Sequence, residues 1–185
     1  MQKIVAACLI LVMTVCVTAC GNSVESVKAP TLAELVDTIN NNKTMNEFAK
    51  EGIDIVAKST GNLLTLSCVY DGSGPQGRKS MTTFSMSKQG NKLSGSVKID
   101  SSNDLMNFEA FIVKSVLGIV VVYAVAAEQG TDVNMGMGTA MDTASGDIEK
   151  YTLEDNGFEY DMDYKTGNLT LTIDLSARIS FEVGD

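Results

Sequence analysis

Four glycine–asparagine dipeptides constrain the fold of this 185-residue chain more than any other feature. Gly and Asn tolerate the positive φ angles that two-residue hairpin loops require. Gly61-Asn62, Gly90-Asn91 and Gly167-Asn168, together with the reversed Asn156-Gly157, each lie between segments in which apolar and polar residues alternate. This arrangement predicts β-hairpins, and therefore antiparallel strands.

Pairing across these turns places apolar residues opposite one another. A slip of one residue would move every apolar side chain to the other face, so the registers are well specified. The expected partners are Ala57 and Leu66, Ile55 and Cys68, and Ile53 and Tyr70 across Gly61-Asn62; Phe84 and Val97, and Ser85 and Ser96, around Gly90-Asn91; Leu153 and Tyr160, and Tyr151 and Met162, across Asn156-Gly157; and Tyr164 and Leu171, Met162 and Ile173, and Tyr160 and Leu175 across Gly167-Asn168.

The alternation that follows the last turn continues from Leu169 to Val183. It indicates either one very long strand or two strands joined near Ser176.

A long apolar segment separates the two groups of strands. Residues 103–128 contain no turn signal and predict one helix that is apolar on nearly all sides. The interruption at Lys114 favours a core helix over a membrane span. The β-branched run Val120-Val121-Val122 leaves a central strand as the alternative.

Two capping boxes predict short helices before the first strand. Thr31 and Glu34 begin one helix, which ends at Asn40-Asn41-Asn42, and Thr44 and Glu47 begin another. The second helix could continue to Ser59, but a strand from residue 53 explains the pairing across Gly61-Asn62. We expect an α+β fold, in which a meander of about 7–8 antiparallel strands packs on the central helix (about 103–128). The N-terminal helices are expected to cover the other side of that helix.

The N-terminus has the properties of an export signal. A single Lys3 precedes the apolar residues 4–17, a run too short for a comfortable membrane span. The tetrapeptide Val17-Thr18-Ala19-Cys20 resembles the lipobox of bacterial lipoproteins. That resemblance implies cleavage before Cys20 and a diacylglycerol thioether on its sulfur. We therefore expect a signal peptide at 1–19, a lipidated tether at 20–30 and a single α+β domain at 31–185.

A second, broader resemblance concerns the domain itself. Gly52-Ile-Asp-Ile, Gly61-Asn62-Leu and Tyr70, behind short helices and a lipobox, are similar to small uncharacterised lipoproteins of gut Firmicutes. The resemblance implies the same location, on the extracytoplasmic face of the cell membrane, and carries no activity with it.

Charge and residue content exclude several classes of function. The net charge of −9, which becomes −10 once Lys3 is removed, argues against nucleic-acid binding. The chain contains no histidine, which excludes Ser-His and Cys-His catalysis and every His-containing metal site. Cys68 lies on the apolar side of a strand pattern, where a buried small hydrophobe is expected.

Carboxylates supply the candidate metal ligands. Glu159, Asp161 and Asp163 alternate on the outer face of one strand, and the expected register places Asp174 opposite Asp161. A Ca²⁺ ion would relieve the repulsion between them, although a solvated polar face is the favoured interpretation. Met135, Met137 and Met141 can offer thioethers to Cu(I), but loose packing on the core is favoured. We expect no metal site and no cofactor.

Two further patterns bear on function. Ser85-Met-Ser-Lys88, Ser101-Ser-Asn103 and Lys165-Thr-Gly167 match, in order, the S-x-x-K, S-x-N and K-T-G elements of penicillin-binding proteins and serine β-lactamases. Here, however, the first lies in a strand and the last in a turn. Thr83, Ser85, Ser87, Ser94 and Ser96 form a hydroxyl-rich outer sheet face that can hydrogen-bond carbohydrate, although it lacks aromatic platforms.

These observations favour a membrane-anchored, non-catalytic binding domain for a protein, peptide or cell-wall partner. The alternative is an envelope hydrolase or transferase that uses carboxylates or a Ser-Lys pair. The sequence assigns no ligand-binding residues.

Overall fold

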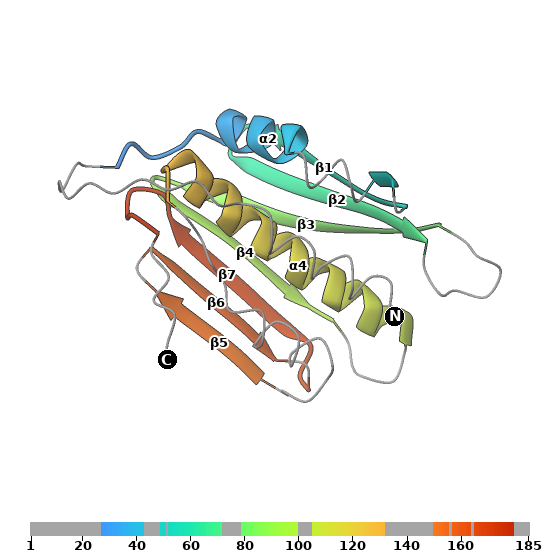
Figure 1. Cartoon of the computed structure of the whole chain (residues 1–185). Coiled ribbons are helices and arrows are strands. Elements are labelled where there is room, and N and C mark those ends of the chain that lie inside the picture. Colours follow the sequence, from blue (N-terminus) through green and yellow to red (C-terminus); the bar gives the residue numbers. More distant parts are fainter. Residues whose placement is uncertain are drawn as a thin grey trace.

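The chain forms one antiparallel sheet with helices packed on one face (Figure 1). The structure is a computed structural model that describes residues 27–42, 49–50, 52–71, 79–99, 105–131, 150–155, 157–163 and 165–179. The elements are α2 (Leu32–Asn41), β1 (Ile53–Thr60), β2 (Leu63–Asp71), β3 (Lys79–Gln89), β4 (Lys92–Lys98), α4 (Leu105–Glu128), β5 (Lys150–Asp155), β6 (Phe158–Asp163) and β7 (Asn168–Asp174). The expected α+β class, with an antiparallel sheet packed on a long helix, is confirmed.

The seven strands within the described residues lie in the order β1-β2-β3-β4-β7-β6-β5. This order departs from the order in the sequence because β7 lies between β4 and β6, so β7 joins the two groups of hairpins. The strand alternative for Val120-Val121-Val122 is wrong, because these residues lie within α4. The helix alternative that extends to Ser59 is also wrong, because β1 begins at Ile53.

Two of the four expected registers are confirmed in full. Across Gly61-Asn62 the structure pairs Ile53 with Tyr70 and Ala57 with Leu66. Across Asn156-Gly157 it pairs Leu153 with Tyr160. In both cases a short turn joins segments whose polarity alternates, so local sequence is sufficient to set the register.

The hairpin at Gly90-Asn91 has the expected register but a shorter ladder. The pairs run from Gln89 and Lys92 to Ser87 and Ser94 and stop before the expected Phe84–Val97 and Ser85–Ser96 pairs. Gly95 explains the interruption, since a Cβ there would lie 2.9 Å from Phe84 Cζ and 2.8 Å from the Ser85 carbonyl oxygen. The Phe84 ring occupies the space that a side chain at position 95 would fill.

The expected register across Gly167-Asn168 is wrong. Met162 pairs with Leu169 and Tyr160 with Leu171, so each β6 residue meets a partner four positions earlier than expected. Asp163 Oδ1 accepts hydrogen bonds from the amides of Lys165 (2.9 Å) and Thr166 (3.0 Å), which stabilises a turn longer than two residues. An even shift keeps every side chain on the same face, so polarity cannot distinguish the two registers.

The chain turns after Asp174, so the alternative of one very long C-terminal strand is wrong. Asp174 Oδ1 accepts hydrogen bonds from Ser176 Oγ (2.6 Å) and from the Ser176 amide (3.0 Å). This local bonding competes with continued strand pairing. Residues 180–185 lie outside the described residues.

Helix α4 crosses the inner face of the sheet and supplies much of the core (Figure 1). A Cβ at Gly118 would lie 3.3 Å from Leu171 Cδ2 and 3.6 Å from Phe84 Cε1, so the helix backbone approaches the sheet closely there. The Tyr160 hydroxyl donates to the Ser115 carbonyl oxygen at 3.3 Å. Ala110–Glu128 is long and apolar enough to cross a membrane, yet most of this segment is buried within the protein.

Helix α2 lies beside α4 rather than over it. It contacts both α4 and β1, which corrects the expectation that α4 is covered on one side by the sheet and on the other by N-terminal helices. The helix begins after Thr31, as the capping box predicted, and its buried residues Leu32, Leu35 and Ile39 form one stripe. The second capping box lies outside the described residues.

The packed chain begins before residue 31. Pro30 is buried and Ala29 packs against the core. Lys28 Nζ lies 3.2 Å from Glu34 Oε1. The free part of the expected tether is therefore shorter than residues 20–30.

Candidate functional site

The candidate metal ligands do not converge. Asp161 lies opposite Thr170, and Asp174 lies opposite Lys92 at the far end of β7, so the expected juxtaposition of Asp161 and Asp174 is wrong. Four residues along a strand separate them by about 13 Å. In the part of the chain that the structure describes, no three Asp, Glu or Cys side chains are grouped as a metal site would need.

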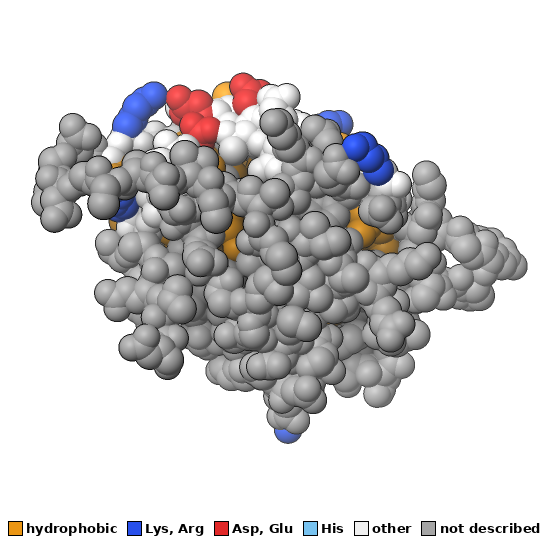
Figure 2. Space-filling view, in the orientation of Figure 1, with side chains coloured by type: hydrophobic (Ala, Val, Ile, Leu, Met, Phe, Trp, Pro, Cys, Tyr) orange, Lys and Arg blue, Asp and Glu red, His pale blue; other side chains and the backbone are white. Residues whose placement is uncertain are grey.

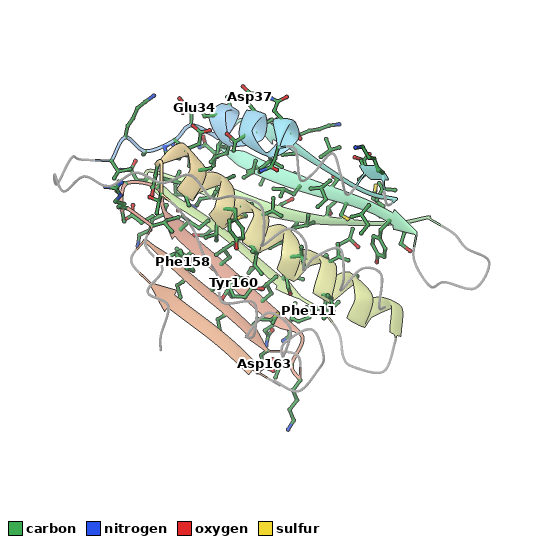
Figure 3. The ribbon with its side chains drawn as sticks, in the orientation of Figure 1. Glu34, Asp37, Phe111, Phe158, Tyr160 and Asp163 are labelled. Atoms are coloured by element: carbon green, nitrogen blue, oxygen red, sulfur yellow. The ribbon has the colours of Figure 1, made fainter. Side chains whose placement is uncertain are left out.

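Two of these carboxylates have structural partners instead. Asp163 bonds the backbone of its own turn. Hydrogen bonds from the Ser176 hydroxyl and amide lower the pKa of Asp174 below its ordinary value. Asp163 lies at the end of β6, on the lower edge of Figure 3. Both side chains therefore stabilise turns.

The residues of the Ser-Lys pattern lie at opposite ends of the sheet. Lys88 pairs with Leu93 beside the Gly90-Asn91 turn. Lys165 lies in the β6–β7 turn, where the Ile99 amide donates to the Gly167 carbonyl oxygen at 3.0 Å. From position 93 to position 99 the chain extends about 20 Å. Lys88 and Lys165 are therefore not brought together, and residues 101–103 lie outside the described residues.

The thiol of Cys68 is buried, as expected. It lies on the inner face of β2 with 2% of its surface exposed. The proposed lipidation site, Cys20, and the methionines at 135, 137 and 141 lie outside the described residues.

The outer face of the sheet, opposite the helices, carries the most distinctive group of exposed polar side chains. The inward residues Phe84, Met86 and Leu93 of β3 and β4 are buried, whereas the outward side chains are exposed: Thr83, Ser85, Ser87, Ser94 and Ser96. The register adds neighbours from β2 and β7. We call this surface the hydroxyl face; it consists of Thr65, Ser67, Thr83, Ser85, Ser87, Ser94, Ser96, Thr170 and Thr172.

Hydroxyl groups on this face align across the strands. Ser87 pairs with Ser94, and Ser94 pairs with Thr172 in β7. Thr65 Oγ1 and Ser85 Oγ lie 3.1 Å apart. Among the described residues, no protein group bonds the hydroxyls of Ser87, Ser94 and Thr172. These three hydroxyls are therefore free to bond a ligand.

Charged side chains surround the hydroxyl face without entering it. Lys58 lies on β1, and Lys92 and Lys98 lie at the two ends of β4. Glu159 and Asp161 lie outward on β6. The centre of the outer face is therefore uncharged over four adjacent strands.

The helix side of the molecule is different in character. Glu34 and Asp37 project outward from α2, and acidic groups of this region are red in Figure 2. Phe111, Phe158 and Tyr160 lie in the layer between α4 and the sheet (Figure 3) and are at most 5% exposed. These aromatic rings belong to the core and are not available to a ligand.

Two side-chain amides hold distant segments together, and the sequence did not reveal either of them. Asn40 Nδ2 donates to the Ala57 carbonyl oxygen (3.0 Å), and the Ala57 amide donates to Asn40 Oδ1 (2.8 Å). Gln129 bonds the backbone at Leu175, Ala177 and Ile179. Asn40 was interpreted only as part of a helix end, and no sequence signal points to Gln129.

Comparison with known proteins adds no relative to this picture. No family model matches the chain, and neither a curated protein nor a solved structure does.

Proposed function

We propose that this chain is a lipoprotein whose domain is held at the extracytoplasmic face of a cell membrane by a lipid on Cys20. The tetrapeptide Val17-Thr18-Ala19-Cys20, behind a short apolar run and a single Lys3, carries this proposal. Two or three acyl chains would anchor the protein stably, because each buried methylene contributes about 0.8 kcal/mol. Residues 1–19 form the signal peptide in this proposal.

The domain stays close to the membrane. The chain is packed against the domain from Ala29 onward, which leaves residues 20–28 as tether. A nine-residue random coil would have a root-mean-square span of about 17 Å, and nine fully extended residues would reach about 31 Å. The domain therefore works within a few tens of ångströms of the bilayer surface.

The domain acts by binding rather than by catalysis in this proposal. The hydroxyl face offers free hydrogen-bonding groups on β3, β4 and β7, at Ser87, Ser94 and Thr172, which suits a binding surface. The alternative, an envelope hydrolase built on carboxylates or a Ser-Lys pair, gains no support from the geometry. Lys88, on β3, lies beside the start of β4, whereas Lys165, in the β6–β7 turn, lies near its end. The outer carboxylates do not converge either.

Mass spectrometry and fatty-acid labelling test the anchor. We expect the mature N-terminus at Cys20, with a diacylglyceryl group on its sulfur, and membrane incorporation of labelled palmitate. Cys20→Ala should abolish the label, whereas Cys68→Ala should keep it because that thiol is buried in the core. A free thiol at Cys20, or label retained by Cys20→Ala, contradicts the proposal.

A further inference from the structure

The composition of the hydroxyl face selects its ligand by charge. A ligand that buries a charged side chain without supplying a counter-charge pays a large desolvation free energy. Burying a hydroxyl that forms a new hydrogen bond costs far less. The nine residues of the face are uncharged, and the outward charges around it are of both signs, with Lys58, Lys92 and Lys98 on β1 and β4 and Glu159 and Asp161 on β6. These separate lysines do not form the basic cluster that an anionic polymer such as nucleic acid needs, and an uncharged ligand matches the face.

The same composition argues against a protein partner. The centres of protein interfaces are enriched in aromatic residues, Met and Arg. The exposed large apolar residues of the outer face are Leu63 and Met81, at 43% and 71% exposure. Ser87, the partner of Leu63, lies six positions from Met81 on β3, which separates them by about 20 Å. They do not form an apolar centre, and the same argument disfavours a second copy of this chain.

The geometry matches a linear polysaccharide. Each Ser or Thr hydroxyl both donates and accepts, as sugar hydroxyls do. Neighbouring strands lie about 4.8 Å apart, close to the repeat of successive sugar rings in an extended β-linked glycan. The row formed by Ser87, Ser94 and Thr172 crosses three adjacent strands, so successive sugars can meet successive hydroxyls.

We propose that the hydroxyl face binds an uncharged glycan strand of the cell wall, laid across β3, β4 and β7. This inference rests on the proposed function, since the lipid anchor on Cys20 is what places the domain beside wall polymers. The face lacks aromatic platforms for stacking, so each sugar contributes little and binding depends on many sugars contacted at once.

Co-sedimentation of the full chain in detergent micelles tests the proposal, with peptidoglycan sacculi stripped of anionic polymers as the probe. Soluble chitin oligosaccharides give the length dependence. We expect affinity to rise with chain length and to be insensitive to salt, because no ion pairs form. The triple variant Ser87→Ala, Ser94→Ala, Thr172→Val should bind about tenfold more weakly or worse, since three modest hydrogen bonds are lost.

A matched control changes a serine outside the face. Ser59→Ala, which follows the inward parity of Ile55 and Ala57 on the edge strand β1, should bind as the wild type does. Both variants should unfold at a temperature near the wild-type melting temperature, which would show that they are folded. The proposal is overturned if the triple variant binds sacculi as tightly as the wild type does, or if moderate salt abolishes binding. It is also overturned if the protein forms a dimer that covers the hydroxyl face. Cys20→Ala is expected to sediment with sacculi unchanged, so failure here and failure of the lipid anchor are distinguishable.

Discussion

Gln129 is expected to be the most important polar side chain for the stability of the domain. Its Nε2 donates to the carbonyl oxygens of Ala177 (2.9 Å) and Leu175 (3.3 Å), and its Oε1 accepts from the Ile179 amide (2.9 Å). Leu175 and Ile179 have no exposed surface. The side chain thus fixes the segment after β7 to the end of α4.

Replacing this amide should cost a large share of the folding free energy. Three hydrogen bonds of about 0.5–1.5 kcal/mol each give a loss of about 2–4 kcal/mol for Gln129→Ala. A domain of this kind is stable by about 5–15 kcal/mol. The urea midpoint should fall by roughly 1–2 M at a typical slope. Gln89→Ala, at an exposed strand end, should change stability by less than about 0.5 kcal/mol.

The isosteric variant Gln129→Glu separates hydrogen bonding from packing. At neutral pH its carboxylate still accepts from the Ile179 amide but faces two carbonyl oxygens that require a donor. At acidic pH the protonated carboxyl regains one donor, so the stability difference from the wild type should narrow. Urea unfolding at both pH values measures it. The reasoning is refuted if Gln129→Glu has the free energy of unfolding of the wild type at neutral pH. It is also refuted if Gln129→Ala lowers that free energy by less than about 0.5 kcal/mol.

Three further outcomes are expected. Asn40→Ala leaves the buried backbone of Ala57 without partners and should cost about 1–3 kcal/mol in urea unfolding, whereas the exposed neighbour Asn41→Ala should cost little. Gly95→Ala places a methyl group 2.8 Å from both Met86 Cγ and the Ser85 carbonyl oxygen, and should lower the melting temperature by several degrees; an unchanged melting temperature contradicts this packing. Hydrogen bonds from the Thr31 amide and hydroxyl, together with Lys28, lower the pKa of Glu34 to about 2. The stability that its carboxylate adds is therefore present above pH 4.5 and is lost as the pH falls towards 2; Glu34→Gln should remove this part of the acid dependence, measured by circular dichroism.

The elements that sequence predicts well are those whose cause is local. The hairpin at Gly61-Asn62 needs only a permissive turn and two alternating segments. The capping box of α2 joins Thr31 and Glu34, three residues apart. Helix α4 follows from an apolar segment without turn residues. In each case the determining residues belong to one continuous segment of the sequence.

The error at Gly167-Asn168 shows where local patterns become ambiguous. Two registers that differ by four residues put the same side chains in the core, and the turn with the stronger local bonding is the one formed. That shift also moved Asp174 away from Asp161 and removed the candidate carboxylate cluster. The expected juxtaposition of Asp161 and Asp174 therefore failed because of the register, not because of the residue types.

Sequence by itself determined the turns, the polarity of each strand face and the helix caps, because backbone preference and side-chain period act over a few residues. Only the tertiary structure decided that β7 pairs with β4, that α2 lies beside α4, and that Gln129 reaches residues 46 to 50 positions away. The extension of the hydroxyl face from the β3–β4 hairpin to β2 and β7 belongs to the second group. The β2 and β7 residues become neighbours of that hairpin only when longer connections close and the inner faces pack on one core, a balance among distant segments that no short stretch of sequence contains.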